Sequence, residues 1–223
     1  MSGDLIDQQA SGTSMDSLNP NSGEPLAGFE HLTIVHELTD ELKEQLVARS
    51  TDDDDASVQR NTSDRNRFGS IEKLDNWLSK GREINLFVDQ QGNLAGIFWS
   101  GEERMPDFDG EAYQELSAES VRQITVAVRL YPPHRGQGDG LAAAIFINSV
   151  NSLFVGRDEA TVVWAETTLD NTRMTKIERQ AGMKQVGINP NNGRGLFAVA
   201  NFKTEVESSE VDDVVGQAQE TFF

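Results

Sequence analysis

Hydrophobic and polar positions alternate along the chain with two periods. A period of two predicts strands in seven segments, at residues 31–38, 84–88, 94–99, 124–130, 161–166, 184–188 and 196–202. The first of these has the pattern of an edge strand. Apolar residues at helical spacing predict helices from Asp40 to near Arg49, from Ser70 to Leu78, after residue 140, and from Asp170 to a stop at Gly182.

This order of elements predicts an α/β (α+β) fold. We expect a mixed, twisted sheet of about six to seven strands, flanked by about four helices. The polar segments 50–55 and 61–67 are predicted to be a charged loop. Segment 100–122 is longer than a hairpin connection needs and contains one short predicted helix at residues 111–117. It is either a flap over a ligand near strand 124–130 or a surface excursion.

The two ends of the chain differ in composition from its middle. Residues 1–27 and 204–223 contain ten acidic residues and no Lys or Arg, so they account for ten of the 18 net negative charges. Such polar segments bury too little apolar surface to order themselves, and we expect both to be disordered. The domain is therefore assigned to residues 28–203.

The middle of the chain is moderately acidic, with 27 acidic and 19 basic residues. This excess disfavours a nucleic acid as partner. It favours a cationic or amine-bearing acceptor, although selection for solubility alone, or a salt-adapted host, would produce the same bias.

Composition excludes several kinds of chemistry. The chain has no cysteine, so disulfides, thiolate metal sites and cysteine nucleophiles are ruled out. No apolar run approaches a membrane span, and the N-terminus lacks the features of a secretory signal, so we expect a cytoplasmic protein without membrane contact. The three histidines form no cluster, and we expect no metal site. The sequence does not indicate an oligomeric state.

A glycine-rich loop lies at the centre of the chain, after the predicted strand 124–130. Pro132 and Pro133 end this strand, and the segment 135–140, Arg-Gly-Gln-Gly-Asp-Gly, precedes an apolar helix. Backbone N–H groups at such a helix start form a site for an anion, most often a phosphate. A nucleotide P-loop would need Lys followed by Ser or Thr where Leu141 and Ala142 stand. A dinucleotide fingerprint would need a different glycine spacing.

The segment 135–140 is similar to the [QR]-x-x-G-x-[GA] signature of the GNAT superfamily of acyl-CoA-dependent N-acyltransferases. About thirty residues later, Asp170–Met174 and Ile177–Met183 resemble a second segment of that family. The resemblance extends over roughly residues 30–203 and implies the GNAT fold. It also implies that the strand before the loop separates from its neighbour, and that acetyl-CoA binds there as co-substrate.

The resemblance implies roles for particular residues. It assigns the CoA pyrophosphate to the loop amides and to Arg135. It assigns the pantetheine arm to main-chain groups of the preceding strand and to the Asn171 side chain. An alternative role for Asn171 is that of a helix N-cap, for which Asn is equally well suited. Asp139 departs from the neutral residue usual at its position, so its carboxylate must point into solvent or weaken CoA binding. The complete set of cofactor-binding residues is Val128, Leu130, Tyr131, Arg135, Gly136, Gln137, Gly138, Gly140, Leu141 and Asn171.

The implied activity is acetyl transfer from acetyl-CoA to a primary amine of a small molecule or protein, by direct attack in a ternary complex. The family often has Glu and Tyr at positions occupied here by Ile124 and Glu178. The catalytic candidates are therefore Glu166 and Glu178, although each has an alternative role as a solvated surface residue. The alternative function is a GNAT-fold module that binds CoA or a partner protein with little or no turnover.

Overall fold

The computed structural model describes residues 23–109, 111–118, 120–136, 140–156 and 159–201. These residues form two compact units. The first contains the described residues up to Trp99 together with Val128–Leu141, and the second contains those of Ser100–Ala127 and those from Ala142 onward. The first strand of the described residues begins at Glu24, four residues before the predicted domain start at Gly28.

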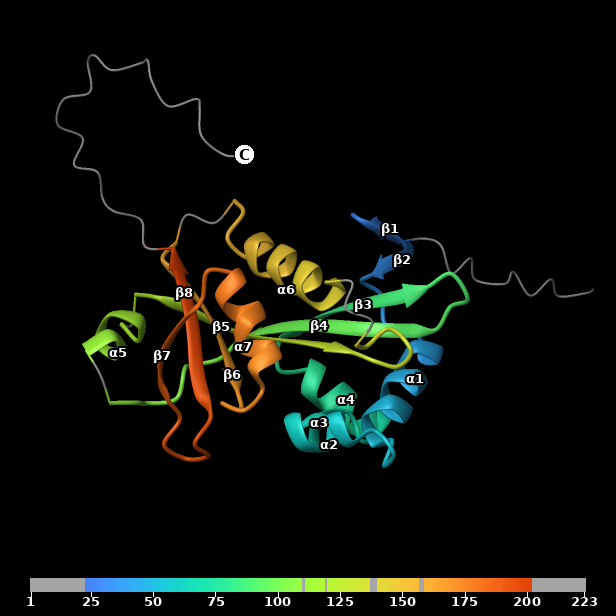
Figure 1. Cartoon of the computed structure of the whole chain (residues 1–223), viewed down its shortest axis with the longest axis horizontal. Helices are drawn as coiled ribbons and strands as arrows, with labels where there is room; N and C mark the ends of the chain where they lie inside the picture. The colour runs from blue at the N-terminus through green and yellow to red at the C-terminus, as the bar shows by residue number, and fades with distance from the viewer. Residues whose placement is uncertain (1–22, 110, 119, 137–139, 157–158, 202–223) are drawn as a thin grey trace, which may run out of the picture. The chain divides into compact units, whose positions relative to one another are not determined.

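The strands form one mixed sheet in the order β1-β2-β3-β4-β5-β6-β8-β7, with β5 parallel to β6 and the pairs β1–β2, β2–β3, β6–β8 and β7–β8 antiparallel (Figure 1). The predicted α/β class is confirmed, but the strand number is wrong, because the described residues contain eight strands. Their bounds are β1 Glu24–Leu26, β2 Phe29–Val35, β3 Arg82–Asp89, β4 Leu94–Glu102, β5 Arg122–Leu130, β6 Thr161–Thr167, β7 Lys184–Ile188 and β8 Gly195–Asn201.

The additional strand is the short β1, and it corrects the prediction that residues 31–38 form an edge strand. β1 pairs with β2 on the side opposite β3, with Pro25 facing Thr33. Proline has no backbone N–H to donate, so it suits the edge of a sheet. The pattern of β2 does not mark an edge position, because this strand has partners on both sides.

The four predicted long helices are confirmed, and their caps have the expected chemistry. The side chains of Thr39, Ser70 and Asn171 accept hydrogen bonds from the first turns of α1, α4 and α7. The described residues contain seven helices: α1 Asp40–Thr51, α2 Ala56–Asn61, α3 Asp64–Phe68, α4 Ile71–Leu78, α5 Glu111–Leu116, α6 Leu141–Ser152 and α7 Thr172–Gln180. None of them is long and apolar enough to cross a membrane.

The prediction of one polar loop across residues 50–67 is wrong, because α2 and α3 lie there. Both helices are too short to show apolar periodicity, and their stability comes from tertiary contacts. In the first unit, Phe68 of α3 packs edge-to-face on Trp77 of α4, with ring centroids 5.0 Å apart, and Trp77 packs in the same way on Trp99.

Segment 100–122 is part of the core of the second unit. Met105, Phe108 and Leu116 of this segment are buried in one apolar cluster with residues of β6 and β8, namely Val162, Trp164, Leu196 and Ala198. The Trp164 indole also donates to the Glu103 carbonyl at 2.9 Å. The segment therefore covers one face of β6 and β8, which supports neither a flap nor a solvated excursion.

Candidate functional site

The end of β5 directs alternate main-chain groups to opposite sides. The N–H of Tyr131 donates to the Ala95 carbonyl of β4 at 2.9 Å. At Gly96 of β4, an added Cβ would lie 2.5 Å from the Arg129 carbonyl oxygen, so the two strands approach closely there. Because backbone groups alternate along a strand, Arg129 and Tyr131 face β4, and the main-chain groups of Val128 and Leu130 face away from it.

The parallel pairing of β5 with β6 ends early. Within the described residues, its register runs from Arg122 with Thr161 to Thr125 with Trp164 and stops there. β5 nevertheless continues to Leu130 and β6 to Thr167, and β6 keeps its register with β8 to its last residue. The pairing therefore ends before either strand does, and main-chain groups at the end of β5 have no partner on β6 among the described residues.

The loop after β5 begins as a tight turn and ends at the first residue of α6. The Tyr131 carbonyl accepts from the N–H groups of His134 and Arg135, at 3.0 and 3.2 Å. Gly136 and Gly140 have φ values of 85° and 80°, in the left-handed region that favours glycine. The predicted ligands Gln137 and Gly138, and the exceptional Asp139, lie outside the described residues.

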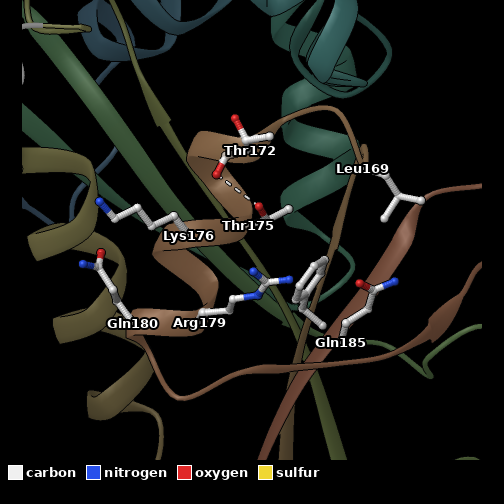
Figure 2. A pocket seen from close by; sticks show the side chains of 8 residues that line it. Leu169, Thr172, Thr175, Lys176, Arg179, Gln180 and Gln185 are labelled. Carbon is white, nitrogen blue, oxygen red and sulfur yellow. Dashed lines mark hydrogen bonds between the residues drawn. The ribbon is translucent and has the colours of Figure 1, made fainter.

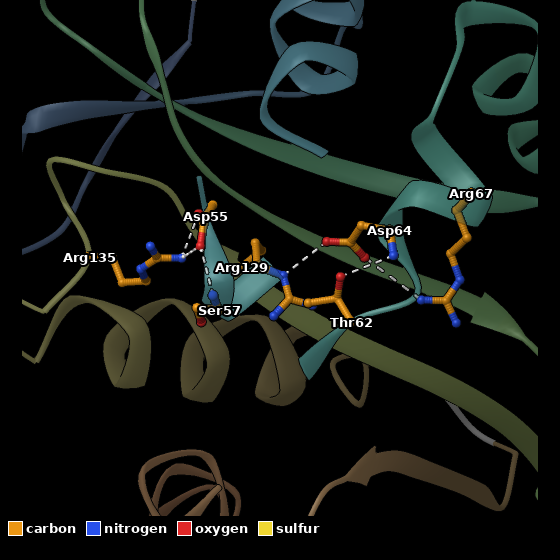
Figure 3. A network of polar contacts seen from close by, with 7 residues as sticks. All are labelled: Asp55, Ser57, Thr62, Asp64, Arg67, Arg129 and Arg135. Atoms are coloured by element: carbon orange, nitrogen blue, oxygen red, sulfur yellow. Dashed lines mark hydrogen bonds and ion pairs between the residues drawn. The ribbon is translucent and has the colours of Figure 1, made fainter. Parts of the chain in front are cut away.

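Two arginines from this region pair with buried aspartates (Figure 3). Nη1 of Arg135 contacts both carboxylate oxygens of Asp55 at 2.8 Å, and Nε of Arg129 contacts Asp64 at 3.0 Å. The Asp55 and Asp64 side chains are 3% and 1% exposed. These pairs join the α2–α3 segment to β5 and the loop, because a buried carboxylate requires a compensating charge.

Tyr131 and Leu141 are core residues, with exposures of 0% and 1%. Burial, followed by the negative charge of Asp64, raises the pKa of the Tyr131 hydroxyl above its usual range. Tyr131 therefore packs its ring inside the first unit and stays protonated. The predicted contact of Tyr131 with the cofactor is not supported, because its ring is buried and its main-chain N–H and carbonyl are engaged with Ala95, His134 and Arg135.

In the second unit, Asn171 occupies the N-cap of α7. Its side-chain oxygen accepts from the Met174 N–H at 3.2 Å. Its amide nitrogen has no hydrogen-bond partner in the described part of the chain. The capping role is therefore confirmed, and the donors of the same side chain are still available to a ligand.

Glu166 holds the hairpin between β7 and β8. Its two oxygens accept from the side-chain amides of Asn192 at 2.8 Å and Asn189 at 2.7 Å, and Arg194 lies 3.6 Å away. The arrangement indicates a structural role.

Glu178, the other catalytic candidate, is fully buried and not a solvated surface residue. The Thr167 hydroxyl donates to Oε1, whereas Oε2 has no hydrogen-bond partner among the described residues. Burial raises the pKa of Glu178 to about 7, although the Thr167 hydrogen bond and the Arg179 charge oppose the shift. At neutral pH the group is therefore present in both protonation states.

A pocket of ≈ 500 Å³ lies beside α7 in the second unit (Figure 2). Lys176 and Gln180 point to one side of the helix, and Arg179 points to the other side, toward Gln185 of β7. The remaining lining residues are Leu169, Thr172, Thr175 and Phe197. With two cations and no acid, this lining suits an anion and disfavours a protonated amine. Within the described ranges, no group of three or more His, Asp or Glu is arranged to hold a metal.

Comparison with solved structures shows that this chain has the GNAT fold, which it shares with several acetyltransferases. AAC(6')-Ib, an aminoglycoside acetyltransferase solved with ribostamycin and coenzyme A, has a TM-score of 0.54 at 15% identity, covering 82% of this chain and 99% of its own. No protein-family model matches the sequence, and no curated protein matches it closely enough to serve as a relative.

Two other acetyltransferases have the same fold. A chimera of Vibrio cholerae spermidine N-acetyltransferase SpeG and hSSAT has a TM-score of 0.50 at 12% identity, over 76% of this chain and 94% of its own. An N-acetyltransferase from Staphylococcus aureus Mu50 has a TM-score of 0.51 at 15% identity, over 75% and 97%. These likenesses show the fold of the chain.

Sequence reasoning missed three residues of these sites. Asp55 and Asp64 stood in a segment taken as loop, and Thr167 was not singled out because a threonine at a strand end is unremarkable in sequence. The run of aspartates near the first helices could have pointed to Asp55 and Asp64. Such a run indicates buried ion pairs as readily as a solvated surface.

Proposed function

We propose that this chain transfers an acetyl group from acetyl-CoA to a primary amine, in a ternary complex. The observation that carries this proposal is the early end of the β5–β6 pairing. It leaves the main-chain groups of Val128 and Leu130, which face away from β4, free to pair with the amide groups of a pantetheine arm. A glycine loop and the start of α6 follow directly, as a diphosphate requires.

The chain offers two kinds of group to acetyl-CoA. Main-chain groups of β5 and of the loop would hold the pantetheine and diphosphate, and the Asn171 amide would donate to the pantetheine. The Arg135 guanidinium would add positive charge. The loop residues in this assignment are Gly136, Gln137, Gly138, Gly140 and Leu141.

In the reaction, the neutral amine nitrogen attacks the thioester carbonyl, the C–N bond forms and the C–S bond breaks. The nitrogen gives up one proton, and the departing thiolate takes up one. A backbone N–H near the end of β5 would stabilise the oxyanion. We assign the proton for sulfur to Glu178, because a carboxylic acid with a pKa of about 7 is an effective donor at neutral pH.

The acceptor is a primary amine, and we favour a cationic one because the chain has a net charge of −18. Two neighbours in fold are named for amine substrates, a polyamine and aminoglycosides. The lysine and arginine of the α7 pocket would repel such an acceptor, so that pocket is not assigned to it.

The test is turnover with acetyl-CoA and a panel of mono-, di- and polyamines, measured by thiol release and by mass spectrometry of the product. Glu178→Gln is expected to lower kcat about a hundredfold, as for loss of a general acid, and to leave the Kd of acetyl-CoA unchanged. The exposed Glu115→Gln is the control and should retain full activity. Unchanged kcat in the Glu178 variant would remove this residue from the mechanism.

The second candidate is a module that binds CoA without turnover. It is favoured by Ile124, which stands where the family often has a glutamate, and by Asp139 in the loop. Thermal stabilisation by acetyl-CoA without product from any amine would favour this alternative. A lack of stabilisation by acetyl-CoA and by CoA would contradict both candidates, and stabilisation by ATP instead would indicate a general nucleotide-binding protein.

A further inference from the structure

Asp55 holds one end of the Arg135 side chain. Both contacts between them, each 2.8 Å, come from the single nitrogen Nη1. Asp55 is 3% exposed, whereas Arg135 is 29% exposed, so the pair has a buried end and an accessible end. The Ser57 N–H also donates to Asp55 at 3.0 Å and fixes the carboxylate at the start of α2.

The rest of the Arg135 guanidinium is available. The group has five N–H donors in a planar fork, and Nη1 carries two of them. Within the described residues, neither Nε nor Nη2 has a hydrogen-bond partner. These two nitrogens form the edge of an arginine that binds phosphate with two parallel hydrogen bonds.

We propose that Asp55 is a positioning residue for the cofactor, because it holds Arg135 with its Nε–Nη2 edge presented to the diphosphate of CoA. This inference rests on the proposed function and adds to it a residue outside the glycine loop. Asp55 itself does not touch the cofactor. It acts by removing the rotational freedom of a long side chain before the ligand arrives.

A direct exchange, in which the phosphate displaces Asp55 from Arg135, is disfavoured. It would leave a buried carboxylate without its counter-ion, and breaking a buried pair in this way is strongly unfavourable. One guanidinium serves both anions at lower cost, with Nη1 on Asp55 and the opposite edge on the phosphate.

The experiment measures the Kd of CoA by calorimetry for the full chain and for its variants. Asp55→Asn is expected to weaken CoA binding about tenfold, because Arg135 is no longer fixed. Arg135→Lys keeps the buried ion pair and the fold but lacks the second edge, and it should also weaken binding about tenfold. Asp53→Asn is the matched control, since Asp53 pairs with Arg65 of α3 instead of the loop. It should bind CoA like the unchanged chain.

The double variant Asp55→Asn with Arg135→Ala isolates the mechanism. If Asp55 acts through Arg135, the double variant binds CoA as weakly as Arg135→Ala alone. Additive losses, or wild-type affinity in Asp55→Asn or in Arg135→Lys, would overturn the inference. Lack of CoA binding by the unchanged chain would instead contradict the proposed function, which separates the two failures.

Discussion

The two units treat buried acids in opposite ways. In the first unit, Asp55 and Asp64 are buried, and each contacts an arginine within 3.0 Å. In the second unit, Glu178 is equally buried, yet its side chain accepts a hydrogen bond from the neutral hydroxyl of Thr167. The ion pairs fix the arginine side chains in place, whereas burial without a contacting cation raises the pKa of Glu178. An arginine partner therefore distinguishes the acids that hold other side chains in place from Glu178, the acid proposed to carry a proton.

The largest test of this contrast is Asp64→Asn. The substitution keeps the shape of the side chain but leaves Arg129, which is only 17% exposed, without its counter-ion. We expect the free energy of unfolding, measured with urea, to fall by about 3 kcal/mol, as for other broken buried pairs. The exposed pair of Asp53 and Arg65 is the reference, and Asp53→Asn should cost less than about 1 kcal/mol. If Asp64→Asn and Asp53→Asn lowered the free energy of unfolding equally, burial of the Asp64–Arg129 pair would contribute nothing to stability.

A second test uses pH and Glu178. Because its folded pKa of about 7 exceeds the ordinary 4.5, the protonated group contributes stability that is complete below pH 4.5 and is lost as pH rises to about 7. The total is roughly 3 kcal/mol, since each pKa unit is worth about 1.4 kcal/mol. Glu178→Gln cannot ionise, so this part of the pH dependence should disappear.

The measurement compares both proteins by urea unfolding at pH 5 and pH 8. Relative to Glu178→Gln, the unchanged chain should lose roughly 2.5 kcal/mol between the two pH values, most of the total. Groups common to both proteins cancel in the difference. A difference that does not vary with pH would mean that Glu178 ionises like an exposed glutamate, and the contrast between the units would fail.

The sequence was sufficient for what depends on local pattern. Alternation and capping residues located β3–β8 and the four long helices, and the glycine loop was found from its composition. What depends on tertiary contacts was not accessible. α2 and α3 are too short for a periodic signal, and the burial of Met105 and Phe108 was hidden in a polar segment. The difference between Glu166 and Glu178 was invisible, because both are glutamates near the same strand and only their partners distinguish them.

Glu166 provides the smallest and most discriminating test, because it is an acid of the second unit that does have partners. Glu166→Gln replaces one acceptor oxygen by an NH₂ group, which donates and does not accept. One of the two hydrogen bonds from Asn189 and Asn192 is therefore lost. We expect a loss of about 1 kcal/mol in unfolding free energy, the usual value of one hydrogen bond. Hydrogen exchange should become faster in the hairpin between β7 and β8. An unchanged free energy of unfolding together with unchanged hydrogen exchange would show that the hydrogen bonds of Glu166 to Asn189 and Asn192 do not hold the hairpin, and the contrast between its structural role and the role of Glu178 would fail.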